Sequence, residues 1–225
     1  MTSSLAHLKP VVDETRRGQI VRKLRALIVS GKVSPGARLT ETDLANQLGV
    51  SRAPLREAIR ELVESGLVES LPYKGLFVRR VTRADLEELY SLRTALEQFA
   101  FRQCWQRRST EALDDLQKRH HHLIAEVEKD RDPERAIELE LILHSWCYEL
   151  SGHALLQKTW DQMKPNLQFY FTLHQKAHHR PGPLREAHDI YVDCAAGDSL
   201  DAMQAHLVQH MRQGLETTMK DIPLD

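Results

Sequence analysis

From Thr82 onward the sequence carries only the hydrophobic spacing of α-helices, and this feature constrains the fold more than any other. No stretch there alternates apolar and polar residues as a half-buried strand does. The pattern predicts helices over 83–107, 109–129, 133–151, 153–175, 183–196 and 198–220, separated by proline, glycine and aspartate signals. Pro165 predicts a kink in the fourth of them. We therefore expect an all-helical bundle of about six helices over residues 82–222.

Residues 16–81 predict a different unit, of three short helices followed by two strands. Apolar residues at helical spacing indicate a first helix within 17–31. Thr40 and Asp43 form a capping-box pattern before a short second helix, which Gly49 ends. Ser51 is placed to cap a third helix, and "GLVESLPYKGLFVRRV" at 66–81 predicts two strands around a turn at 72–75. This order is typical of a winged helix-turn-helix, so the whole chain is expected to be mainly α, with residues 1–15 as a tail.

Charge divides the chain in the same place. Residues 16–80 hold 13 Lys and Arg against 6 Asp and Glu, a net charge of +7. Residues 81–225 hold 17 against 24, a net charge of −7. A basic segment with this order of elements is typical of a nucleic-acid-binding domain.

The third helix of the basic domain is expected to contact the bases of DNA. Arg52 and Arg56 lie near its N-terminus, which meets base edges in helix-turn-helix proteins, and Arg60 continues the same strip. An arginine guanidinium can donate two hydrogen bonds to guanine or hold a phosphate. The alternative is a solvated helix whose arginines pair with neighbouring glutamates.

The remaining composition argues for an intracellular protein. No apolar run approaches the roughly 20 residues that span a bilayer. The N-terminal stretch "MTSSLAHLKP" has no long apolar core, so no secretory signal is expected. Cys104, Cys147 and Cys194 are odd in number and widely spaced, which favours reduced thiols over a disulfide framework. We expect a cytoplasmic protein that does not contact membranes.

Two stretches resemble known domains. "PGARLTETDLANQLGVSRAPLREAIRELVESGLVES" followed by "KGLFV" is similar to the DNA-binding domain of GntR-family transcription regulators. "LYSLRTALE", "ELILHSWCYELSGHALL" and "EAHDIYVDCAAGDSLDAM" resemble the metal-binding ligand domain, or FCD domain, of the FadR branch. The resemblance implies a homodimer on a short inverted-repeat operator. The residues expected to contact DNA are Arg38, Thr42, Ser51, Arg52, Ala53 (where the family usually has Thr), Arg56, Lys74 and Gly75.

Glu140 and His144 predict a metal site within this helical domain. They lie four residues apart, so they share one face of a helix with several leucines. His188 and His210 also fall on apolar faces of their predicted helices. By resemblance these four residues bind one divalent ion per chain, with Zn²⁺ or Ni²⁺ as first candidates and Mn²⁺ as a further one. His206, one turn before His210, is the competing ligand, whereas His120, His121 and His122 are expected on a solvated face.

The resemblance also implies a small organic acid as effector. Its carboxylate would occupy open positions on the metal, with Arg93 as a second anchor and with His153 and Tyr191 nearby. Arg93 has an alternative role as a surface arginine paired with Glu97 four residues on. His153 could instead simply cap its helix.

The function expected is a metabolite-responsive transcription regulator, most readily a repressor, and not an enzyme. The main alternative is a constitutive DNA-binding protein whose metal is only structural. A metal-dependent hydrolase fused to a DNA-binding domain is less favoured, because the chain has neither an HExxH motif nor a nucleophile elbow.

Overall fold

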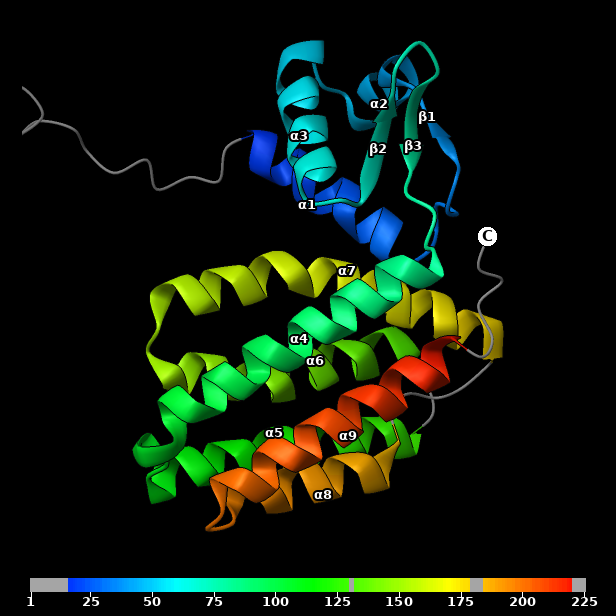
Figure 1. The fold of residues 1–225 in the computed structure, drawn as a ribbon. Helices are drawn as coiled ribbons and strands as arrows, with labels where there is room; N and C mark the ends of the chain where they lie inside the picture. Colours follow the sequence, from blue (N-terminus) through cyan, green and yellow to red (C-terminus); the bar gives the residue numbers. More distant parts are fainter. Residues whose placement is uncertain (1–15, 130–131, 179–183, 220–225) are drawn as a thin grey trace, which may run out of the picture.

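The computed structural model describes residues 16–129, 132–178 and 184–219, so the tail expected for residues 1–15 lies outside it (Figure 1). The N-terminal unit consists of α1 (Arg16–Val29), β1 (Arg38–Leu39), α2 (Glu41–Leu48), α3 (Arg52–Glu64), β2 (Val68–Leu71) and β3 (Gly75–Val78). The three strands form an antiparallel sheet in the order β1-β3-β2. Sequence analysis predicted β2 and β3 but missed the two-residue strand β1.

Local sequence signals set the ends of the two helices that form the helix-turn-helix. The side chain of Thr40 accepts a hydrogen bond from the backbone N–H of Asp43 at 3.3 Å, as the capping pattern predicts. Gly49 ends α2 in the left-handed conformation, with φ of 63°. Ser51 does occupy the N-cap position of α3, but its side chain makes no capping hydrogen bond.

The helical unit consists of α4 (Arg83–Cys104), α5 (Thr110–Lys129), α6 (Pro133–Ser151), α7 (Ala154–His178), α8 (Arg185–Ala196) and α9 (Leu200–Met219). A 3₁₀ turn, η1 (Trp105–Arg107), follows α4. Within the described residues this confirms a mainly α chain with a winged helix-turn-helix and a helical bundle. Pro165 lies inside α7, and the helix continues on both sides of it. None of the described helices combines the length and apolarity that crossing a bilayer requires.

The packing of the bundle brings α4, α6, α8 and α9 around one interior. α6 packs against α4, α5 and α7, while α9 packs against α4 and α8 (Figure 1). α6 is buried around most of its circumference, which explains its unusually apolar sequence. Its polar residues must therefore find partners inside the bundle or face a cavity.

The hydrophobic core of the N-terminal unit includes residues from the helical bundle. α1 of the N-terminal unit packs against α7 (Figure 1). Phe169 and Tyr170 of α7 join Leu86 of α4 in the same buried cluster as the core of the winged helix-turn-helix. The side-chain amide of Asn166 on α7 also donates a hydrogen bond of 2.9 Å to the backbone carbonyl of Ser65, just after α3. Residues of α4 and α7 thus help to hold the N-terminal unit in place.

Candidate metal centre and nucleic-acid interface

Three histidines from three helices meet inside the bundle. His144 lies on α6, His188 on α8 and His210 on α9, and one ring nitrogen of each lies within 4.8 Å of the others. All three are buried, with exposed fractions of 0, 3 and 8%. The half-buried His206 is not part of this group, although its ring centroid lies 5.5 Å from that of His210. The structure therefore brings together the three predicted histidines and leaves the competitor beside them.

Hydrogen bonds at the outer nitrogens orient two of these rings. The Nδ1–H of His188 donates to the backbone carbonyl of Leu184 at 2.9 Å. The Nδ1 of His144 lies 2.7 Å from Oε1 of the buried Glu97, where an N–H donates to the carboxylate. These bonds leave the Nε2 lone pairs of both rings for the interior, and neither Nε2 atom has a hydrogen-bond partner in the described part of the chain. Unpartnered buried nitrogens of this kind fit the inner ligands of a metal ion.

Glu140 lies at the edge of the histidine group. Its Oε1 is 3.8 Å from Nε2 of His188, and its side chain is 13% exposed. Burial raises the pKa of the Glu140 carboxyl to about 7, although the nearby Arg93 acts to lower it. A carboxylate destabilised by burial gains most from a cation beside it. Glu140 is therefore placed to supply an oxygen ligand next to the three nitrogens.

The protonation states of the histidines suit metal binding. Burial lowers the pKa of His144 and His210 well below the ordinary histidine value, and neighbouring positive groups add to the effect. Burial lowers the pKa of His188 to about 4. Imidazoles that are neutral at pH 7 keep the lone pair that a metal needs. One carboxylate oxygen and three imidazole nitrogens form a donor set that fits Zn²⁺, Ni²⁺ or a related divalent ion.

Arg93 is buried. The alternative prediction, that Arg93 is a surface arginine paired with Glu97, was therefore wrong about its location. Its side chain is 2% exposed, and its Nε donates to Oε2 of Glu97 at 3.4 Å, so the i, i+4 pairing itself exists. Its Nη2 is buried and has no hydrogen-bond partner among the described residues. A buried guanidinium nitrogen without an acceptor is costly, and an anion would relieve that cost.

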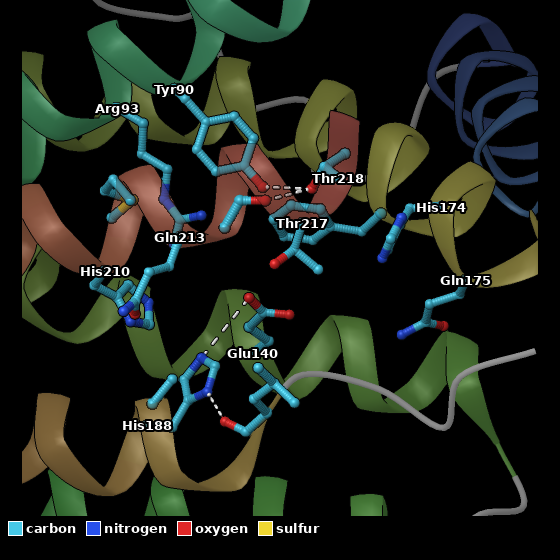
Figure 2. Close-up of a pocket in the computed structure, with 15 residues that line it drawn as sticks. Tyr90, Arg93, Glu140, His174, Gln175, His188, His210, Gln213, Thr217 and Thr218 are labelled. Atoms are coloured by element: carbon cyan, nitrogen blue, oxygen red, sulfur yellow. Dashed lines mark hydrogen bonds and ion pairs between the residues drawn. The ribbon is translucent and has the colours of Figure 1, made fainter. Parts of the chain in front are cut away.

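A cavity of about 120 Å³ opens beside these groups. By the same measure roughly 10–15 Å³ holds one water, so the cavity has room for a small organic molecule. Figure 2 shows Arg93, Glu140, His188 and His210 at one end and His174 and Gln175 towards the other. Tyr90, Phe171, Leu184 and Met211 supply much of the apolar wall. Sequence analysis identified the polar end of this cavity but not these wall residues, which come from α4, α7, α9 and the residue just before α8.

Two residues expected at the effector do not line this cavity. Tyr191 is fully buried, and its hydroxyl donates to Oε1 of Glu97 at 2.8 Å. His153 lies at the start of α7, where its Nδ1 accepts a hydrogen bond from the backbone N–H of Leu156 at 3.2 Å. Its ring packs against Phe99, with centroids 5.5 Å apart. The structure thus gives Tyr191 a supporting place behind His144 and gives His153 the capping place that the sequence left open.

The solvated face expected for His120, His121 and His122 needs one correction. His121 and His122 are exposed, but His120 is only 8% exposed. Its Nε2 lies 2.9 Å from a carboxylate oxygen of Asp189 on α8. α5 packs against α8 on that side, so one of three consecutive histidines necessarily faces the interior.

The residues expected to contact DNA lie on one end of the N-terminal unit. The first turn of α3 and the turn between β2 and β3 both lie at the end away from the helical bundle (Figure 1). All eight expected residues are exposed: Arg38, Thr42, Ser51, Arg52, Ala53, Arg56, Lys74 and Gly75. The surface therefore combines a helix N-terminus with a wing, which is the arrangement that winged helix-turn-helix proteins present to DNA.

Two contacts organise the side chains of this surface. Glu41 at the start of α2 accepts a hydrogen bond of 2.9 Å from Nε of Arg56. Arg38 lies along the wing, because a Cβ atom at Gly75 would be 3.5 Å from its Nε. Gly75 has φ of +108°, a conformation that disfavours any side chain. Beside it, Tyr73 is fully exposed at the wing turn with φ of +63°.

Comparison with known proteins places both units. A family model of bacterial regulatory proteins of the gntR family matches residues 16–78, and a model of the FCD domain matches residues 88–213. The uncharacterized HTH-type transcriptional regulator YdhC of Bacillus subtilis is 26% identical over 198 residues, 88% of each chain. The gluconate operon transcriptional repressor of Bacillus licheniformis is 24% identical over 197 residues, 85% of this chain and 80% of the relative.

The solved structure of McbR/YncC from E. coli has the same fold, with a TM-score of 0.76 at 24% identity over 92% of this chain and 98% of that one. The matched families and these relatives are regulators of transcription rather than enzymes, so the hydrolase alternative is set aside. The helical unit of this chain belongs to the FCD domain family, and its N-terminal unit is a helix-turn-helix domain of the gntR family of bacterial regulatory proteins.

Proposed function

We propose that this regulator binds one divalent metal ion per chain in its helical unit and uses it to sense a small carboxylate. The observation that carries the proposal is that two features adjoin one cavity, which His188, His210 and Arg93 line. Three buried histidine nitrogens lie within 4.8 Å of one another, and Nη2 of Arg93 is buried nearby without an acceptor. A carboxylate that bridges a divalent ion and a guanidinium satisfies both features at once.

The proposed metal ligands are Glu140, His144, His188 and His210, with Zn²⁺ or Ni²⁺ favoured and Mn²⁺ a further candidate. Four protein ligands leave positions on an ion with five or six ligands, and an effector can take them. When bound, the ion would add its positive charge to that of Arg93 within a unit that is acidic overall. Binding of an anion therefore depends on local groups rather than on the overall field of a unit with net charge −7.

The relatives support the choice of a carboxylate and of repression. Two of them are gluconate operon transcriptional repressors, from Bacillus licheniformis and Bacillus subtilis, and gluconate is a carboxylate. Another is a probable D-xylose utilization operon transcriptional repressor from Paenarthrobacter nicotinovorans. We propose a repressor that acts as a homodimer on a short inverted repeat of double-stranded DNA.

The proposed mechanism couples the cavity to the DNA-binding surface through α7. Phe171 and Gln175 of α7 line the cavity, while Phe169 and Tyr170 of the same helix pack into the core of the winged helix-turn-helix. An effector that shifts α7 changes the support of the N-terminal unit, and with it the spacing of the two units of a dimer. Such a coupling between two binding sites is typically worth about 1–3 kcal/mol.

The first test measures metal. Purified protein should carry about one divalent ion per chain, and Glu140→Ala, His144→Ala, His188→Ala and His210→Ala should each lower occupancy. His206→Ala is the matched control, since His206 lies one turn from His210 on the same helix and outside the ligand group. Loss of metal in His206→Ala with full occupancy in His210→Ala would reverse the assignment.

The second test measures the switch. A panel of metabolite carboxylates is screened for thermal stabilisation of the metal-loaded protein, because a ligand of the folded state raises apparent stability. The best binder should change affinity for a selected operator by roughly 5–150-fold without being consumed. Arg93→Ala should weaken the carboxylate and spare DNA binding by the effector-free protein. Binding of the carboxylate with no change in operator affinity would leave a constitutive DNA-binding protein with a structural metal.

A further inference from the structure

Glu97 is the most enclosed carboxylate of the helical unit. It lies on α4 with an exposed fraction of 0%. It does not line the cavity, and it is not one of the residues grouped as possible metal ligands. Three donors nevertheless converge on its two oxygens. His144 and Tyr191 donate to Oε1 at 2.7 and 2.8 Å, and Arg93 donates to Oε2 at 3.4 Å. Burying a carboxylate so completely is expensive, and these three donors offset the expense.

We infer that Glu97 is a positioning residue that aims two groups at the effector site: the metal-facing nitrogen of His144 and the anion-facing nitrogen of Arg93. The inference rests on the proposed function and deepens it. One carboxylate outside the cavity would then set both the affinity for metal and the affinity for the carboxylate ligand.

The first half of the inference concerns His144. A hydrogen bond from Nδ1–H to Glu97 fixes the tautomer in which Nε2 carries the lone pair, and it also fixes the ring plane. The ring centroid of His144 lies 5.6 Å from that of His188 and 5.3 Å from that of His210. Because Glu97 engages Nδ1, Nε2 is the nitrogen that remains for this group. A carboxylate behind a ligating imidazole also makes that imidazole more basic, and hence a stronger ligand.

The second half concerns Arg93. Its Nε is engaged by Oε2 of Glu97, and its guanidinium carbon lies 5.8 Å from the ring centroid of Trp160. These contacts hold the planar guanidinium, while Nη2 has no acceptor among the described residues and Arg93 lines the cavity. Because a guanidinium presents its donors in a rigid fork, fixing Nε also fixes the direction of Nη2.

Tyr191 belongs to the same arrangement. Its hydroxyl donates to Oε1, the oxygen that His144 also uses, and its ring packs edge-on against that histidine with centroids 4.7 Å apart. Tyr191 therefore holds the carboxylate in place while Glu97 holds the ring. Its effect on metal should be smaller than that of Glu97, because its removal leaves the Glu97–His144 bond intact.

The experiment uses the full chain and measures metal affinity with a competing chelator, for wild type, Glu97→Gln, Glu97→Leu and Tyr191→Phe. Loss of outer partners of metal ligands typically costs about 10–100-fold in affinity, and we expect this range for Glu97→Leu. Glu97→Gln keeps the volume and one acceptor oxygen, so its loss of metal affinity should be smaller, and Tyr191→Phe should lose least. Urea unfolding of each metal-free variant records its structural cost separately.

Two further readouts distinguish positioning from a general structural role. In a His144→Ala background, Glu97→Leu should cause little further loss of metal affinity, because its partner is already gone. With Co²⁺ bound, the visible absorption spectrum of Glu97→Gln should differ from that of wild type, and acetate, used as a simple carboxylate probe, should bind more weakly at saturating metal. Full additivity with His144→Ala, or an unchanged spectrum and acetate affinity, would overturn the inference.

The proposed function and this inference fail differently. If wild-type protein takes up no divalent metal, or if His144→Ala leaves the metal affinity unchanged, the proposed metal site is wrong. If wild type binds metal and His144→Ala loses it, while Glu97→Leu binds as wild type does, only the positioning role of Glu97 is overturned.

Discussion

Two arginine–glutamate pairs in this chain have the same chemistry and opposite surroundings. On the DNA-binding surface Nε of Arg56 lies 2.9 Å from Glu41, with side chains 58% and 34% exposed. Inside the helical bundle Nε of Arg93 lies 3.4 Å from Glu97, with side chains 2% and 0% exposed. The surface pair is shorter and should nevertheless contribute less to stability, because water solvates both of its charges when they separate.

Because their surroundings differ, the two pairs should differ in how easily the arginine can leave its glutamate. A solvated arginine can leave its glutamate for a base or a phosphate at little cost, so Arg56 can exchange partners when DNA arrives. Arg93 cannot leave Glu97 without stranding a charge in the interior, so it should keep its place and bind a ligand with its remaining nitrogen. Distance alone is therefore a poor guide to which ion pair is fixed and which is exchangeable.

The largest expected effect breaks the buried pair. Arg93→Leu should lower the free energy of unfolding of the metal-free protein by about 3–5 kcal/mol, because it leaves the buried carboxylate of Glu97 without its arginine partner. The double variant Arg93→Leu/Glu97→Leu should recover part of that loss, because it removes the buried charge but leaves the Nδ1–H of His144 and the hydroxyl of Tyr191 without an acceptor. Urea unfolding measures all of these. A double variant as unstable as the single one would show that the packing of Arg93, and not its charge, matters.

The next effect is the pH dependence of metal affinity in the buried site near Arg93 and Glu97. Near Arg93, burial holds the pKa of Glu140 at about 7, whereas that of His188 lies at about 4. Protons should therefore compete with metal at Glu140 first, and affinity should fall roughly 20-fold between pH 7.5 and pH 5.5. Glu140→Gln should bind metal more weakly but with a flatter dependence over the same range. Chelator competition at each pH would contradict this if the variant were as steep as wild type.

The third effect concerns DNA binding by the exposed arginines of α3. Arg52→Ala and Arg56→Ala should each weaken binding to a selected operator by about 1–3 kcal/mol if they read bases. Lys74→Ala, at the wing, should weaken binding to all duplexes alike if that lysine meets phosphate. Titrations on selected and random duplexes at matched salt compare them. Unchanged operator affinity in both arginine variants would remove α3 as the reading helix.

The smallest effect breaks the surface pair. Glu41→Gln should change the free energy of unfolding by less than about 1 kcal/mol, since the pair is solvated. The same variant should strengthen binding to DNA slightly, because Arg56 no longer has a carboxylate to leave. Thermal unfolding and operator titration measure the two quantities. A loss of stability comparable to that of Arg93→Leu would end the distinction between the two pairs.

Patterns local in the sequence predicted the elements and several of the site residues. Helical spacing and capping signals gave the helices, and the faces on which His144, His188 and His210 lie followed from the same spacing. The strand β1 was missed because two residues, Arg38 and Leu39, are too few to show an alternating pattern, and only pairing with β3 defines them.

Burial and partnership could not be predicted in the same way. The sequence offered Glu97 only as a neighbour of Arg93 four residues away. Its bonds to His144 and Tyr191 join residues 47 and 94 positions apart, and no local pattern encodes them. The exposure of His120 was misjudged for the same reason, because the helix that covers it, α8, begins 65 residues later. What a side chain touches across a bundle depends on how helices pack.

The core shared by the two units bears on how members of this family can be recombined. Phe169 and Tyr170 belong to the helical unit by sequence, yet they lie in the cluster that also holds Leu62 and Val78 of the N-terminal unit. A chimera joined at residue 81 would pack the N-terminal unit of one relative against the α7 surface of another. A chimera of two relatives should therefore carry, together with residues 16–81, the face of α7 that packs against them. That face includes Asn166 and its hydrogen bond to Ser65. The junction of such a chimera is a patch in space and not a point along the chain.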